Sequence, residues 1–418
     1  MSSITKLPCE VIVLVLRDLG NMRSLLPCLL TCRYFYSCFR ENPGVAADIL
    51  RQQVTPALIP YSIAALEASR LNPRTGAAVQ ELLETLYTEP SKLADRLRTM
   101  SVPLLAKMGN MHEATHSLAT TFANSSWTCL SNDQGSRISG SLSLSSAEYF
   151  RFCRAFYRVE LYFCLFRTST PSTAAELLDG SDKERFLSKH APWENEQLGC
   201  ALEFLERQLS EASHDVLAHD VELGELGIDY LTAGDGNGWR QLWLSQGIGF
   251  IYRLINENSY ETKKALLKST FGAGSADLYE ALCTPSEEGL DDVIPLAEYT
   301  DEALTTLFPV LDSQDTDKGP FEAWRVAFNV WPRCAWVMLV NSFGLRKRAY
   351  VFWDWDRLER YGMLELSDNV PEGSELQYTG EEYDAMYESF KERSNIWQKG
   401  GSGYWSRGDE SKIVWRHR

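Results

Sequence analysis

The sequence has little that would direct a protein into or across a membrane. Residues 1–5 contain no basic segment followed by an apolar core of the kind that directs secretion. The longest strongly apolar stretch near the C-terminus, residues 334–345, is bounded by Arg333 and Arg346. It is shorter than the roughly 20 apolar residues that a spanning helix requires. We therefore expect neither a secreted protein nor a membrane protein.

The sequence also lacks a disulfide framework. Its 10 cysteines form no CxxC pair and no regular spacing, and most of them lie in apolar runs with helical periodicity. Free cysteine in such a run behaves as a small hydrophobic residue, and disulfides are rare in reducing compartments. The pattern predicts reduced thiols and a protein of the cytoplasm, the nucleus or both.

Positive charge is scarce. With 41 Lys and Arg against 57 Asp and Glu, the formal net charge is −16. Proteins bind nucleic acids and anionic membranes by neutralising phosphate, so we expect neither as a partner, and a basic partner fits better. The excess is concentrated in residues 280–322, which hold 12 acidic side chains against Lys318 alone. A solvated loop explains that segment more simply than a docking patch.

The chain carries no internal repeat and no complete catalytic motif of several common types. No self-similarity at a period of roughly 20–50 residues is found, which excludes leucine-rich repeats, kelch repeats and WD40 propellers. The run Trp353-Asp354-Trp355-Asp356 contains the WD dipeptide but is not repeated elsewhere along the chain. The sequence contains no GxSxG motif, no Walker loop and no GxGxxG ahead of a helix. These absences lower the expectation of an enzyme without removing it.

What the sequence does carry is helical periodicity along most of its length. Apolar residues recur at spacings of three and four through residues 104–130, 148–166, 198–209 and 239–254. The segment 148–166 is so apolar that we expect it at the centre of the core. Only residues 348–353, rich in aromatic and β-branched side chains, predict a strand. The expected fold is mostly α, with an irregular helical domain and at most a small β element near the C-terminus.

The first forty residues form the most informative pattern. Pro8 suits the first turn of a helix because the N–H that it lacks would have no partner there, and Glu10 complements the positive end of the helix dipole. The apolar face of this first helix consists of Val11, Ile12, Val15, Leu16 and Leu19. The second apolar run consists of Leu25, Leu26, Leu29, Leu30, Cys32, Phe35, Tyr36 and Phe39. Two helices of this size need the rest of the chain or another protein to cover them.

This order of residues resembles the F-box. The match consists of Leu7-Pro8-x-Glu10, paired aliphatic residues, a polar turn, and a helix that reaches Cys32-Arg33 before an aromatic residue. Two positions depart from the pattern: Phe35 stands where the F-box usually has tryptophan, and Pro27 lies early in the second helix. The chain also looks like a group of uncharacterised fungal F-box proteins in residues 45–71, 152–158 and 319–324.

The resemblance implies a non-catalytic substrate receptor of a Skp/cullin/F-box ubiquitin ligase, without a cofactor. The N-terminal hairpin would bind the Skp-type adaptor and, through it, the cullin, and the helical remainder would bind a target protein that the sequence does not name. The residues implied in adaptor binding are Leu7, Pro8, Glu10, Val11, Ile12, Val15, Leu16, Leu19, Leu25, Leu29, Cys32 and Phe35. The expected domains are the F-box (1–42), a helical segment (43–130), a Ser/Gly-rich loop (131–146), a helical substrate-binding module (147–398) and a flexible tail (399–418).

A zinc metallopeptidase is the main enzymatic alternative. His112-Glu113-x-x-His116 matches HExxH on an expected helix, where two imidazoles one turn apart can share a zinc ion and the glutamate can polarise a bound water. The nearest downstream acid on a helix is Glu148. Five-residue motifs also occur by chance, and Gly109 just ahead would weaken the helix, so we expect no metal here. A third possibility is a helical scaffold or interaction protein whose hairpin is merely core.

Three arginines are the candidate substrate contacts. Arg151, Arg154 and Arg158 recur at spacings of three and four and form a basic stripe on an apolar helix. Guanidinium groups in such a stripe can receive a phosphorylated or acidic peptide. More often, the stripe is paired with acids on a neighbouring helix. The sequence leaves both interpretations open.

Overall fold

A computed structural model of the chain describes residues 4–134, 140–168, 178, 180–232, 237–283, 293–295, 300, 315–327, 330–332, 343–364 and 378–415. These residues are mostly helical, and their strands form two antiparallel two-stranded pairs, which confirms the predicted fold class. No helix within these ranges is both long enough and apolar enough to cross a membrane. The acidic segment 280–322 and the apolar stretch 334–345 lie largely outside the described residues.

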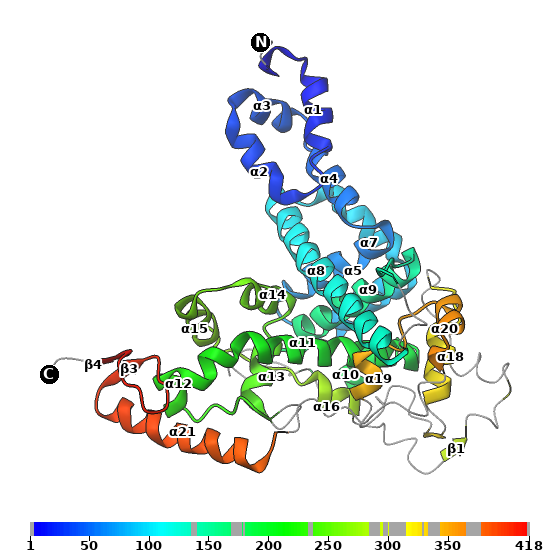
Figure 1. Cartoon of the computed structure of the whole chain (residues 1–418). Helices are drawn as coiled ribbons and strands as arrows, with labels where there is room; N and C mark the ends of the chain where they lie inside the picture. Colours follow the sequence, from blue (N-terminus) through cyan, green and yellow to red (C-terminus); the bar gives the residue numbers. More distant parts are fainter. Residues whose placement is uncertain are drawn as a thin grey trace.

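The N-terminal helices project from one end of the molecule (Figure 1). The predicted second helix is divided into two helices at Cys32, whose backbone is extended, with φ −156° and ψ 151°. The Cys32 Sγ accepts a hydrogen bond from the Phe35 N–H and so caps the start of the third helix. We call this part the N-terminal module; it consists of η1 (Ile4–Lys6), α1 (Cys9–Arg17), α2 (Met22–Thr31) and α3 (Arg33–Glu41).

A group of shorter helices connects the module to the body. Thr75 caps α6, since its side chain accepts a hydrogen bond from the Ala78 N–H. Thr55 makes no such capping bond, although Pro56 begins a short helix directly after it. The elements are α4 (Val45–Gln53), η2 (Pro56–Leu58), α5 (Ile59–Ala68), α6 (Gly76–Thr88), α7 (Pro90–Arg96) and η3 (Leu97–Thr99).

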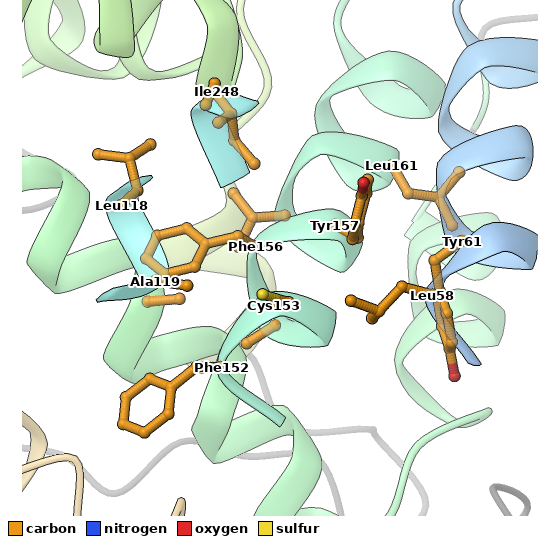
Figure 2. Packing of buried hydrophobic residues seen from close by; sticks show 14 of the residues in the cluster. Leu58, Tyr61, Leu118, Ala119, Phe152, Cys153, Phe156, Tyr157, Leu161 and Ile248 are labelled. Carbon is orange, nitrogen blue, oxygen red and sulfur yellow. The ribbon is translucent and has the colours of Figure 1, made fainter. Parts of the chain in front are cut away.

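Three long helices, α8 (Val102–Gln134), α9 (Ser146–Phe166) and α11 (Pro192–His219), form the core of the body. The central position predicted for residues 148–166 is confirmed, because α9 packs on α5, α8 and α11. Its start is fixed by a capping box in which Ser145 and Glu148 each bind the other's backbone N–H. Figure 2 shows Phe152 and Phe156 of α9 beside Ala119 of α8.

The predicted helix over residues 239–254 is broken in two. Gly247 has φ +89°, and a Cβ there would lie 2.5 Å from a carboxylate oxygen of Glu160. That carboxylate, from α9, accepts the Ile248 N–H at 2.6 Å and so begins a new helix. The remaining helices are α10 (Gly180–Leu187), α12 (Val221–Glu225), α13 (Gly238–Leu244), α14 (Ile248–Asn256), α15 (Tyr260–Lys268), α16 (Leu278–Cys283), α18 (Gly319–Ala327), α19 (Phe343–Lys347), α20 (Trp355–Tyr361) and α21 (Gly380–Gln398).

The predicted strand at residues 348–353 is wrong. These residues form turns after α19, in which Ala349 has φ +49° and the Trp353 indole N–H donates to the Arg348 carbonyl at 2.9 Å. The bulky side chains that suggested a strand are buried in the core instead. The strands observed are β1 (Val293–Pro295) paired with β2 (Val330–Pro332), and β3 (Gly401–Gly403) paired with β4 (Ile413–Trp415).

The C-terminal segment 399–418 is structured through Trp415, which differs from the flexible tail expected there. Trp405 and Ile413 are buried against Val221 and Ile396, so the β3–β4 hairpin has its own small core. The Trp405 N–H also donates to the His219 carbonyl at 2.7 Å. Buried aromatic area and backbone hydrogen bonds therefore hold this segment on α11, α12 and α21. In the Ser/Gly-rich segment 131–146, the first four residues continue α8, and residues 135–139 lie outside the described ranges.

Candidate functional site

The N-terminal module exposes a large share of the apolar side chains that lie at the surface. In the described part of the chain 13 large hydrophobic residues are exposed, and 8 of them lie between residues 4 and 36. Exposed apolar residues scattered singly are ordinary, whereas a concentration on one small module indicates a surface that another molecule covers. The exposed apolar set of the module consists of Ile4, Leu7, Val11, Leu14, Val15, Leu26, Leu30 and Tyr36.

The first helix of the module, α1, has two apolar sides. Successive residues are rotated by about 100° around a helix axis, which separates its apolar residues into two groups. The inner side packs on α3 and α4 and consists of Ile12, Val13 and Leu16. The outer side is exposed and consists of Val11, Leu14 and Val15. One side therefore holds the module together, and the other remains available to a partner.

The second helix repeats this arrangement. Leu25 and Leu29 are buried, at 2 % and 8 % exposure, while Leu26 and Leu30 are 64 % and 76 % exposed. A helix that carries large apolar residues on two sides is normally buried on both of them. The two outer leucines lie one turn apart, so they present a continuous apolar strip along α2.

The structure divides the predicted adaptor-binding residues into three groups. The exposed ones are Leu7, Pro8, Glu10, Val11 and Val15, and the half-buried ones are Leu19 and Cys32. The buried ones, Ile12, Leu16, Leu25, Leu29 and Phe35, hold the three helices together and offer no surface to a partner. The resemblance did not include the most exposed apolar residues of the described part of the module, which are Leu14, Leu26, Leu30 and Tyr36. The sequence signal that could have identified them is the second apolar side of α1 and of α2.

The start of the module is tied down by α3. The Tyr34 hydroxyl donates to the Leu7 carbonyl at 2.8 Å and so fixes the backbone ahead of Pro8. A hydrogen bond with Cys38, and then burial, raise the pKa of the Cys9 thiol to about 11. The nine cysteines in the described ranges are free thiols.

The module is held on the body by a close approach of α2 to α8. The Gln53 side chain bridges the two helices, accepting from the Met22 N–H at 3.1 Å and donating to the Gly109 carbonyl at 3.0 Å. A Cβ at Gly109 would lie 2.7 Å from the Met22 Cβ. Glycine at this point of α8, which weakens the helix locally, is therefore required by the contact with α2.

The two histidines of the HExxH sequence each pair with a tyrosine of α9. His112 Nδ1 lies 2.9 Å from the Tyr157 hydroxyl, and His116 Nδ1 lies 2.9 Å from the Tyr149 hydroxyl. Burial, and then the neighbouring His116, lower the pKa of His112 to about 4, so its imidazole is neutral at neutral pH. These pairs join α8 to α9.

The acids that a zinc site would need are engaged elsewhere. Glu113 accepts from Arg23 of α2 at 3.0 Å. Glu148, the expected third ligand, is fully buried and accepts from the Arg357 guanidinium at 2.6 and 2.7 Å. Within the described ranges no group of three or more His, Cys, Asp or Glu side chains is placed to hold a metal ion.

The three candidate arginines of α9 are buried, which corrects their prediction as substrate contacts. Arg151, Arg154 and Arg158 are at most 1 % exposed. Arg151 donates to Asp315 at 2.8 Å and to Asp354 at 2.7 Å, and Arg154 lies 2.8 Å from Glu194. A buried charge must be paired, and these arginines find acids from distant parts of the chain. The alternative interpretation, pairing with acids on a neighbouring helix, holds for Arg154 and Glu194 of α11.

The comparisons with known proteins add no family to this description. Searches against protein-family models, curated proteins and solved structures found no match for the chain.

Proposed function

We propose that this chain is an F-box substrate receptor of a Skp/cullin/F-box ubiquitin ligase. The N-terminal module binds the Skp-type adaptor, the adaptor links it to the cullin, and the helical body holds a target protein. The chain itself carries out no bond chemistry. It raises the local concentration of the target near a ubiquitin-loaded enzyme, in the cytoplasm, the nucleus or both.

The observation that carries the proposal is the exposed apolar set of the module. It lies on the helices whose residue order resembles the F-box, and these helices project from the body, where a partner can reach them (Figure 1). Leaving several large apolar side chains in water is unfavourable by about 25 cal/mol for each Å². A protein partner that covers them recovers this free energy, and the apolar strip of α2 suits a helical adaptor surface.

The test is binding of the purified full chain to a purified Skp-type adaptor. We expect Leu30→Glu to weaken this binding at least about tenfold, because the substitution buries a carboxylate in an apolar interface. Leu226→Glu is the matched control: Leu226 is a leucine of the body that is also exposed, at 47 %. It should bind as the unchanged chain does, and both variants should keep the thermal unfolding midpoint. Failure of the unchanged chain to bind, or full binding by Leu30→Glu, would refute the proposal.

A further inference from the structure

A second surface lies at the other end of the molecule from the module. A cavity of about 340 Å³ opens between the C-terminal part of α11, the side of α21 and the loop that follows β3. We call it the C-terminal cavity. Its volume lies in the range of about 300–1,000 Å³ that is typical of ligand sites. In Figure 1 these elements lie far from α1, α2 and α3.

The wall of the C-terminal cavity is largely aromatic and apolar. Tyr230, Tyr378 and Trp405 line it, and Leu231 and the buried Met386 add aliphatic surface. The faces of tyrosine and tryptophan rings carry negative charge density and attract cations. The aromatic lining therefore favours a flat or cationic group over an anion.

The charged groups of the cavity are mostly acidic. Glu382, Glu388 and Glu392 line it from α21, and its one arginine, Arg407, is already paired with Glu388 at 2.9 Å. Two glutamates therefore remain in excess. Burial, and then His219, lower the pKa of His214 against the pull of Asp215, so this imidazole adds no positive charge at neutral pH.

A guanidinium group already uses the same aromatic residue from inside the protein. The guanidinium carbon of the buried Arg393 lies 5.8 Å from the centre of the Trp405 ring and 5.3 Å from that of Phe390. Arginine suits such a place because its planar group stacks on aromatic rings while its N–H groups donate to oxygen acceptors, which for Arg393 are the Leu217 and Asp220 carbonyls and the Ser389 hydroxyl. The cavity offers both kinds of partner to a cation arriving from solvent.

We propose that the C-terminal cavity binds a guanidinium-bearing cation, either as the arginine side chain of a peptide segment or as a free guanidinium compound. The acidic net charge of the chain, −16, would favour the approach of such a ligand. This cavity is separate from the module, so the proposal does not depend on whether the module binds an adaptor.

The test is calorimetric titration of the purified full chain with three probes. The first is a blocked tripeptide with a central arginine, and the second is the same tripeptide with neutral citrulline, which keeps the shape and removes the charge. We expect the arginine peptide to bind at least about tenfold more tightly. The third probe, n-propylguanidine, carries one guanidinium with neither a second charge nor a peptide backbone. Equal affinity for n-propylguanidine would assign a free guanidinium compound to the cavity, and tighter binding of the arginine peptide would assign a peptide segment.

Two charge-reversing variants of α21 locate the site. Glu392→Lys places a positive charge in the cavity, and we expect it to weaken binding at least about fivefold. Asp384→Lys makes the same change of charge at an exposed position of the same helix outside the cavity lining, and we expect an effect within about twofold. Equal binding of the citrulline peptide, equal effects of the two variants, or no binding of either guanidinium probe would each overturn the proposal.

Discussion

Replacing Gly109 by alanine tests how closely the N-terminal module is held on the body. An added Cβ would lie 2.7 Å from the Met22 Cβ and 3.0 Å from the Gln53 Oε1. The Met22 Cβ is fixed to the backbone of α2, and the Gln53 amide is fixed by its two hydrogen bonds between α2 and α8. Neither atom can rotate away, so the helices have to move apart.

The expected magnitude combines two opposing terms. Glycine to alanine within a helix stabilises by about 0.5–1 kcal/mol through propensity, and forcing a methyl group into a filled contact costs about 1–3 kcal/mol. Gly249 is the matched control, because it lies in α14 and no atom is within 4 Å of its added Cβ. We therefore expect Gly249→Ala to be more stable than the unchanged chain, and Gly109→Ala to be less stable than Gly249→Ala by about 1–3 kcal/mol.

The assay is urea unfolding followed by circular dichroism, together with limited proteolysis after the module. A displaced module should make the connection near Gln53 easier to cleave in Gly109→Ala than in Gly249→Ala. Equal stabilisation by both substitutions, with equal resistance to proteolysis, would show that α2 does not lie against α8 as described.

Two further predictions concern buried charge. The unfolded chain takes up a proton on His112 at a higher pH than the folded chain does, because the folded pKa is lowered to about 4. The free energy of unfolding should therefore fall by about 3 kcal/mol as the pH drops from 6.5 to 4. Urea midpoints measured over this pH range should change less in His112→Gln, and an unchanged pH dependence would contradict the prediction. Asp315→Asn should lower the free energy of unfolding by about 3–5 kcal/mol, because the buried Arg151 and Arg154 each lose one of their carboxylate partners. The control Asp356→Asn, at an exposed position, should change it by no more than about 0.5 kcal/mol. Similar unfolding midpoints for the two variants would refute the ionic role of Asp315.

The long helices could be predicted from the sequence, because their apolar period is sustained over many turns. The interruptions could not, because they are set by other parts of the chain. The break at Gly247 depends on the Glu160 carboxylate of α9, and the turns at residues 348–353 depend on burial of Trp353 in the core. Local propensity favoured a continuous helix in the first case and a strand in the second, and tertiary contacts overrode both.

The candidate sites show the same limit. Helical periodicity placed Arg151, Arg154 and Arg158 on one stripe, but their partner Asp315 is 164 residues beyond Arg151, and no local pattern announces that pairing. The sequence also predicted helices for most of the apolar residues of the module, although Leu19 lies beyond the end of α1 and Cys32 is extended between α2 and α3. It could not say which side of α1 faces outward, because that depends on where α3 and α4 pack. The C-terminal cavity has no sequence signal, since its lining joins residues from separate helices and the C-terminal loop.

The proposed receptor role also sets a mechanical requirement, which α8 is suited to meet. A receptor that works by proximity needs a fixed distance between the partner on one end and the target on the other, because a flexible joint would dilute the effective concentration. The 33 residues of α8 form one continuous helix about 50 Å long, which contacts α2 near Gly109 and continues from there into the core of the body. Contacts hold α8 at two levels along its length. Gln53 and the Arg23–Glu113 pair bind it on the module side, and Phe122, further along the helix, stacks on Phe204 of α11 at 4.8 Å. A substrate bound to the body would therefore be held at a defined position relative to whatever covers the module.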